Sequence, residues 1–142
     1  MRVGKLNNPT RIVNVNPHKY LIDWNNDGGS KLEVKFRDFI RPHWENLYLV
    51  LFQFRIPGSL LRFDFLNINK KLIIEVDGNQ HNDFNPHFHR NSRAVYVESL
   101  KRDLDKEKWC EQNDIRLLRL NEEDLFNLSL KYIEINYNIN LL

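Results

Sequence analysis

The alternation of apolar and polar positions predicts one helix before the first clear strand. Ser30 and Glu33 have the spacing of a capping box, and apolar residues then recur every three to four positions, as they do on one face of a helix. Pro42 is expected to end this helix near Arg41. The preceding residues, 1–29, show few periodic signals, so no regular element is predicted there.

Three apolar runs then predict three strands joined by short turns, over residues 47–54, 60–66 and 71–77. Further along the chain, the pattern predicts a helix over 99–112, a strand over 115–120 and a last helix capped by Asn121. This order predicts an α/β fold, with a mixed sheet of four or more strands flanked by helices. The last strand would return after a helical crossover.

The composition is that of one globular domain. The chain has 142 residues, of which 42% are hydrophobic and 28% charged. No run of apolar residues approaches the ~20 needed for a membrane span, and the first ten residues lack the apolar region of a secretory signal. Cys110 is the only cysteine, which excludes an intrachain disulfide and fits a cytoplasmic protein.

Basic residues are concentrated at the start of the chain, although the net charge is only +2. The first 22 residues hold Arg2, Lys5, Arg11 and Lys19 and no acidic residue. We therefore expect residues 1–29 to form a basic N-terminal arm ahead of a domain over 30–142. Such an arm either contacts a phosphate-bearing partner or only increases solubility, and the sequence leaves both open.

Acidic side chains interrupt the otherwise apolar second and third strands. Because strand side chains alternate between faces, Glu75 and Asp77 share one face. A turn centred after position 68 would place Asp64 opposite Ile73, on that same face. Asp64 and Glu75 would then be diagonal neighbours, about 7–8 Å apart at the backbone.

Carboxylates gathered on one face repel each other, and a hard divalent cation such as Mg²⁺ or Mn²⁺ would relieve this repulsion. The alternative is a solvated sheet face on which Arg62 pairs with Glu75. His81, four residues after Asp77, is either a proton acceptor or an ordinary surface side chain. Glu33 either only closes its capping box or also leans toward the carboxylates.

Three short motifs resemble the PD-(D/E)XK nuclease superfamily. They are Arg-Phe-Asp-Phe at 62–65, Ile-Glu-Val-Asp-Gly-x-x-His at 74–81 and Lys-Arg-Asp-x-x-Lys at 101–106. The chain is most similar to the branch related to very-short-patch repair endonucleases, which includes small phage and intron-associated homing endonucleases. The resemblance covers about residues 30–120. It implies a restriction-endonuclease-like core and metal-dependent hydrolysis of DNA phosphodiester bonds.

The resemblance also implies a metal site. Asp64 and Glu75 match the metal-binding acids of the superfamily, and the Val76 carbonyl would complete the ligands for Mg²⁺, with Mn²⁺ as the alternative ion. Asp77 occupies the position that usually carries the lysine of the superfamily.

In the related branch, a histidine in the following loop and a later acid take part in catalysis. His81 and Asp103 fit these two positions, and Glu33 fits an acid of the first helix. His81 would then act as the base, oriented or charged by Asp103.

The partner implied by the resemblance is double-stranded DNA, and a homodimer is left open. Basic residues near the motifs and in the arm would hold phosphates; these are Arg90, Arg93, Lys101, Arg102, Lys106, Arg2, Lys5 and Arg11. The predicted function is a phage-type homing endonuclease, acting in the host cytoplasm if the protein is phage-encoded. The alternatives are a Holliday-junction-type resolving nuclease and a DNA-binding module with a degenerate nuclease site.

Overall fold

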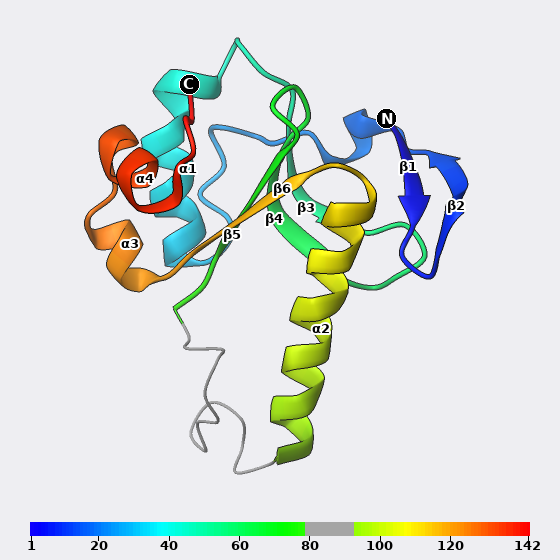
Figure 1. The fold of residues 1–142 in the computed structure, drawn as a ribbon. Coiled ribbons are helices and arrows are strands. Elements are labelled where there is room, and N and C mark those ends of the chain that lie inside the picture. The colour runs from blue at the N-terminus through cyan, green and yellow to red at the C-terminus, as the bar shows by residue number, and fades with distance from the viewer. Residues whose placement is uncertain (79–92) are drawn as a thin grey trace.

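A four-stranded mixed sheet forms the centre of the protein in the computed structural model, which describes residues 1–78 and 93–142 (Figure 1). In hydrogen-bonding order, its strands are β3 (Val50–Arg55), β4 (Arg62–Asn67), β5 (Leu72–Val76) and β6 (Arg116–Leu120). The first three form an antiparallel meander, and β6 runs parallel to β5 after the crossover helix α2 (Arg93–Gln112). The predicted α/β class with a mixed sheet is confirmed, whereas the restriction-endonuclease-like core stays a prediction.

Helices pack on both sides of this sheet (Figure 1). One side carries α1 (Lys31–Trp44), α3 (Glu122–Phe126) and α4 (Leu130–Tyr137), which share a buried apolar cluster with Phe65 and Ile74 of the sheet. The other side carries α2, whose Trp109 is fully buried in a second cluster. None of the helices in the described ranges is long and apolar enough to span a membrane.

The first twenty residues contain regular structure that the sequence pattern did not predict. β1 (Arg2–Lys5) and β2 (Asn8–Asn14) form an antiparallel hairpin, and a 3₁₀ helix follows at Pro17–Tyr20. The hairpin packs against α2, because the Trp109 indole N–H donates to the Gly4 carbonyl at 2.8 Å. Period-2 alternation in β1 is short and is interrupted by Gly4, which explains why the pattern missed it.

Two predicted helix boundaries were wrong. α1 continues through Pro42 to Trp44, because Trp44 is fully buried and its indole N–H donates to the Leu141 carbonyl at 2.6 Å. These contacts outweigh the tendency of Pro42 to end a helix. α2 begins at Arg93, six residues before the predicted start at Ser99.

The predicted last helix is two helices. Asn121 caps α3, as expected, and forms a capping box with Asp124, but α3 ends at Phe126, and Ser129 caps α4. The two helices are held together by Asp124, a buried carboxylate that accepts hydrogen bonds from the Tyr132 and Tyr137 hydroxyls at 2.8 and 2.5 Å. A second cap interrupts the helix without changing the apolar spacing, so periodicity alone did not reveal it.

We predict that Gly4→Ala destabilises the whole domain. The added Cβ would lie 2.6 Å from the backbone oxygen of Pro9, so the hairpin must distort against α2. We expect a loss of about 1–3 kcal/mol in the free energy of unfolding, measured with urea. Gly28→Ala is the matched control, since its Cβ meets mainly the exposed Asn26 side chain and should cost less than about 0.5 kcal/mol. Equal stabilities for the two variants would show that the hairpin contributes little to folding.

Candidate active site

The centre of the candidate site is the position where β3 and β4 change faces. Phe52 and Phe65 contact each other in the cluster on the α1 side, but Phe54 and Phe63 both contact Trp109 of α2. The position between them is occupied by Gln53 on β3 and Asp64 on β4. Gln53 has a φ of 52°, in the left-handed region, which costs of order 1–3 kcal/mol for a residue other than glycine.

This change of face brings the Asp64 carboxylate to the point where β4 and β5 separate. Pairing between the two strands ends at Phe65 and Ile74, and the next N–H of β5 that could bond to β4, that of Val76, donates instead to Asp64 Oδ2 at 2.9 Å. Gln53 Nε2 donates to Asp64 Oδ1 at 3.3 Å. Asp64 therefore replaces a backbone partner at the open end of the sheet.

The observed register differs from the predicted one by two residues. Leu66, not Asp64, lies opposite Ile73, so the register continues with Asp64 opposite Glu75. The reason is a longer turn between the strands, in which Lys70 N–H donates to Asn67 Oδ1 and Lys71 takes a φ of 51°. A shift of two residues preserves the faces, so the two acids are direct rather than diagonal neighbours.

Glu33 joins this group from the first turn of α1. Its carboxylate closes the predicted capping box by accepting the Ser30 N–H at 3.2 Å, and it also accepts from Gln53 Nε2 at 3.2 Å. Both roles considered from the sequence are therefore present. The Gln53 amide thus connects Glu33 to Asp64.

Burial and mutual repulsion change the proton affinity of these acids. Burial, followed by the charge of Glu75, raises the pKa of Asp64 to about 6. The pKa of Glu33 is also raised, first by burial and then by the charge of Asp64. Each group is costly to ionise next to its neighbour.

Lys106 of α2 supplies positive charge from the opposite side of the sheet. Its Nζ lies 2.6 Å from Glu75 Oε1, with both side chains largely buried, and 5.6 Å from the centre of the Phe63 ring. Lys106 neutralises Glu75, and the charge of Arg37 acts on Glu33. Among the described residues, the three carboxylates of Glu33, Asp64 and Glu75 therefore outnumber these two cations.

The other predicted catalytic residues lie beside this group or outside the described residues. Asp77 follows β5, and its backbone N–H donates to the Leu120 carbonyl at 2.9 Å. Asp103 lies one turn before Lys106 on α2, and its carboxylate is 3.8 Å from Arg119. His81, the predicted base, lies outside the described residues, as does Arg90.

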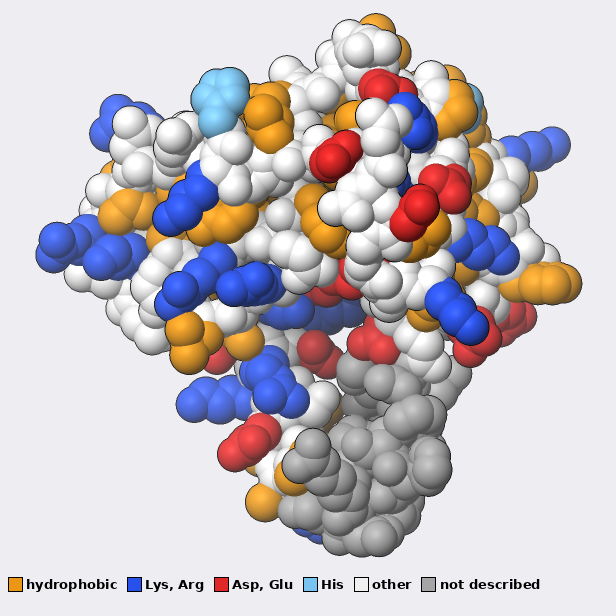
Figure 2. Space-filling view, turned by 180° about the vertical axis from the view of Figure 1, so that it is seen from behind, with side chains coloured by type: hydrophobic (Ala, Val, Ile, Leu, Met, Phe, Trp, Pro, Cys, Tyr) orange, Lys and Arg blue, Asp and Glu red, His pale blue; other side chains and the backbone are white. Residues whose placement is uncertain are grey.

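The predicted DNA-binding residues are spread over two elements. Arg93, Lys101 and Arg102 are exposed on α2, and Arg2 and Arg11 are exposed on the N-terminal hairpin. Figure 2 shows a hollow in which acidic and basic side chains meet, with many further Lys and Arg side chains on the surface to its left. Basic side chains therefore lie on the same face of the molecule as this hollow.

The donor set suits a hard divalent cation. Within residues 1–78 and 93–142, no three His, Cys, Asp or Glu side chains gather closely enough to enclose a metal ion. Mg²⁺, however, usually keeps several waters and binds through only one or two carboxylates together with substrate phosphates. Asp64 and Glu75, which repel each other at the strand ends, meet this requirement.

Sequence reasoning missed two features of the candidate site. Gln53 carried no signal, because glutamine in an apolar strand shows neither its left-handed backbone nor its two acidic partners. The ion pair between Lys106 and Glu75 was not expected, although the place of Lys106 in the third motif put it near the acids. This ion pair depends on how α2 crosses the sheet, which local spacing does not specify.

No protein-family model, curated protein or solved structure matches this chain. The similarity to PD-(D/E)XK nucleases therefore rests on the three motifs, and the nuclease assignment remains a prediction.

We predict that Asp64→Asn stabilises the protein at neutral pH. The folded state raises the pKa of Asp64 from its ordinary value near 3.8 to about 6, so the folded protein binds this proton more tightly than the unfolded chain. Above pH 6 the ionised group therefore destabilises the fold, and this penalty disappears as the pH falls from about 6 to 4. Asparagine removes the charge and keeps an oxygen for the Val76 N–H.

Thermal unfolding across this pH range would test the prediction. At pH 7 the variant should melt about 2–4 °C above the wild type, and the difference should shrink toward pH 4. Glu134→Gln, at an exposed position on α4, is the control and should show no such trend. A melting difference that does not depend on pH would show that Asp64 is not destabilised by its charge.

Proposed function

We propose that this chain is a metal-dependent endonuclease that hydrolyses phosphodiester bonds in double-stranded DNA. The observation that carries the proposal is the Asp64–Glu75 pair at the separating ends of β4 and β5, with a third acid and, in the part of the chain that the structure describes, one ammonium beside it. A structural role would favour pairing each carboxylate with a cation. An incompletely neutralised acidic group among exposed basic residues suits a divalent cation and a phosphate backbone.

Asp64, Glu75 and the Val76 carbonyl would hold the ion, with Mg²⁺ favoured by the all-oxygen donors and Mn²⁺ as an alternative. When bound, such an ion supplies positive charge that stabilises the negative charge developing on the phosphoryl oxygens and makes water more acidic. Gln53 keeps Asp64 in place by donating to its Oδ1, and Glu33 receives the second hydrogen of the same amide.

Lys106 is the described residue best placed to handle a proton. Its Nζ is fixed by Glu75 at 2.6 Å, and this bond leaves two of its three hydrogens for other partners. An ammonium in this position can donate to a phosphoryl or leaving-group oxygen. Lys106 would thus do the work of the superfamily lysine, whose position in the motif is occupied here by Asp77. The role of His81 stays a prediction.

We predict that Glu75→Gln and Lys106→Met each abolish DNA cleavage without unfolding the protein. Incubation of the wild type with supercoiled plasmid and Mg²⁺ should give nicked or linear product, and EDTA should prevent it. Glu75→Gln should reduce the rate at least about 100-fold, since even the partners of metal ligands are worth 10–100-fold. Lys106→Met should reduce it about 10²–10⁴-fold, as expected for a proton donor.

The control for both variants is Glu134→Gln, which should retain the wild-type rate. Circular dichroism would verify that each variant is folded. Folded Glu75→Gln protein that cuts at the wild-type rate would exclude this site as the nuclease centre. A four-way junction tested beside the plasmid separates a junction-resolving nuclease from a homing endonuclease, since the two would share the site and differ in the DNA they cut.

A further inference from the structure

Two arginines lie directly opposite each other next to the candidate site. Arg55 ends β3 and Arg62 begins β4, and the two are paired across the strands. The adjacent Ile56 N–H donates to the Leu61 carbonyl at 2.9 Å, so the arginines occupy a non-hydrogen-bonded position, where side chains are closest. Like charges in direct opposition destabilise a sheet.

Nothing in the described ranges compensates this repulsion. Both arginines are exposed, and no ion pair joins either of them to a carboxylate of residues 1–78 or 93–142. Arg55 is oriented by its Nε, which donates to the Ser59 carbonyl at 2.8 Å. This bond uses one edge of the guanidinium and leaves its other N–H groups for a ligand.

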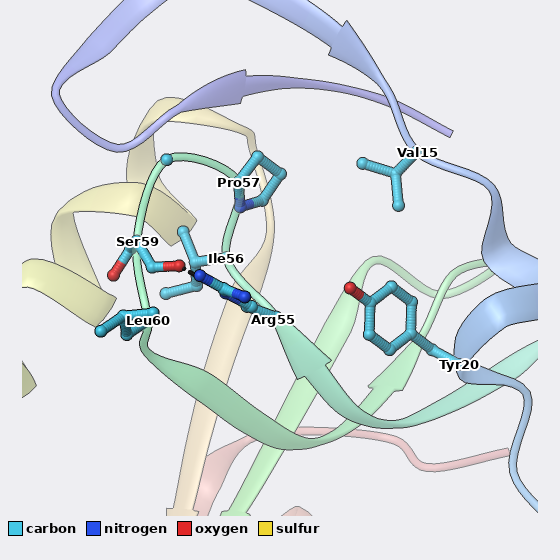
Figure 3. Close-up of a pocket in the computed structure, with 8 residues that line it drawn as sticks. Val15, Tyr20, Arg55, Ile56, Pro57, Ser59 and Leu60 are labelled. Carbon is cyan, nitrogen blue, oxygen red and sulfur yellow. Dashed lines mark hydrogen bonds between the residues drawn. The ribbon is translucent and has the colours of Figure 1, made fainter.

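Arg55 also borders a pocket of about 440 Å³ beside the turn that joins β3 to β4 (Figure 3). In Figure 3 the hydroxyl of Tyr20 points into this space toward Arg55, whose guanidinium is bonded to Ser59. The Tyr20 ring is supported edge-on by Phe54, at 5.3 Å between ring centres. Val15 and Pro57 supply apolar wall, so the pocket combines a cation, an aromatic ring and apolar surface.

The arginine pair has a fixed position relative to the acids. Arg55 is two residues from Gln53 on β3, and Arg62 is two residues from Asp64 on β4, so the arginine pair lies a short step along the strands from the acids. Two strand residues span about 6.8 Å. This is about the axial rise of two nucleotides in one DNA strand.

We propose that Arg55 and Arg62 bind a phosphodiester group of the DNA strand, one or two nucleotides from the one that reacts at Asp64. The adjoining pocket receives the nucleoside attached to that phosphate, with Tyr20 and the apolar wall against it. This inference rests on the proposed function, because it takes the strand at Asp64 to be DNA. It adds two arginines to the basic residues considered from the sequence and gives them a position along the substrate.

The salt dependence of DNA binding tests this inference. Fluorescence anisotropy with a labelled 30-base-pair duplex would be measured in EDTA, so that cleavage does not interfere. Each lost phosphate contact should reduce the slope of log affinity against log salt by about 0.9. Because the two arginines share one phosphate, we expect this full loss for the double variant and a partial loss for Arg55→Ala and for Arg62→Ala. Thermal melting should show equal or higher stability for the double variant, because the repulsion is removed.

Arg116→Ala is the matched control. Arg116 is also exposed and also donates to a backbone carbonyl, that of Tyr137 at 3.1 Å, but it begins β6 rather than lying beside the acids. Its removal should leave the slope unchanged. A double variant of Arg55 and Arg62 that behaves like the control would overturn the inference.

Two further measurements separate the alternatives. Thymidine 5′-monophosphate at 1 mM should not displace the duplex; displacement that requires Arg55 would overturn the assignment to a DNA strand and indicate a mononucleotide site. If the wild type cuts plasmid DNA but the arginine substitutions do not change the salt slope, the phosphate contact is refuted and the endonuclease proposal is retained. Reduced slopes in a protein that cuts no DNA with Mg²⁺ or Mn²⁺ would support the contact and refute the endonuclease.

Discussion

The hydrogen bond from the Val76 N–H to the Asp64 carboxylate determines the geometry of the candidate site. It fills, with a side chain, the place where β4 would otherwise continue its pairing with β5. The two strands can separate there without leaving this N–H unsatisfied, which would cost about 1–3 kcal/mol if it were buried. The left-handed Gln53 on the neighbouring strand makes this arrangement accessible, because it changes the face on which the following side chains lie.

The same arrangement explains why the site is electrostatically unfavourable in the protein alone. Glu33 comes from α1, whereas Asp64 and Glu75 come from strands β4 and β5, and each carboxylate is held by hydrogen bonds or by the ammonium of Lys106. The hydrogen bonds fix the positions of the carboxylates without cancelling their charge. Such preorganised, incompletely neutralised groups are typical of sites that bind a charged ligand, and they are stable only where the surrounding fold is rigid.

The large features of the fold could be predicted from the sequence, because they depend on local patterns. The capping box at Ser30, the three-stranded meander and the crossover to β6 all follow from spacing and turn residues. The shared face of Asp64 and Glu75 also followed, since strand alternation survives a register shift of two residues. Their direct opposition did not, because it depends on the length of a turn that contains no glycine or proline.

The features that could not be predicted arise from tertiary contacts. Pro42 remains in a helix because Trp44 is buried against the C-terminal residues. β1 is stabilised by the hydrogen bond from Trp109 of α2 to the Gly4 carbonyl. The ion pair between Lys106 and Glu75 joins elements 31 residues apart in sequence. Local propensity carries no information on such contacts. The motifs could therefore indicate which residues belong to the site, but not where they lie or which partners they have.

The attachment of the N-terminal hairpin to α2 has a consequence for folding during synthesis. Gly4 finds its partners in Trp109 and Asn113, more than 100 residues later in the chain. The paired strands β3, β4 and β5 are close together in the sequence and can form while the chain is still being made, but the hairpin cannot complete its packing until α2 has left the ribosome. Lys106 arrives with the same helix. During synthesis the acids Glu33, Asp64 and Glu75 therefore emerge before Lys106. The docking of α2 then buries the second apolar cluster and brings Lys106 to Glu75 in one late step.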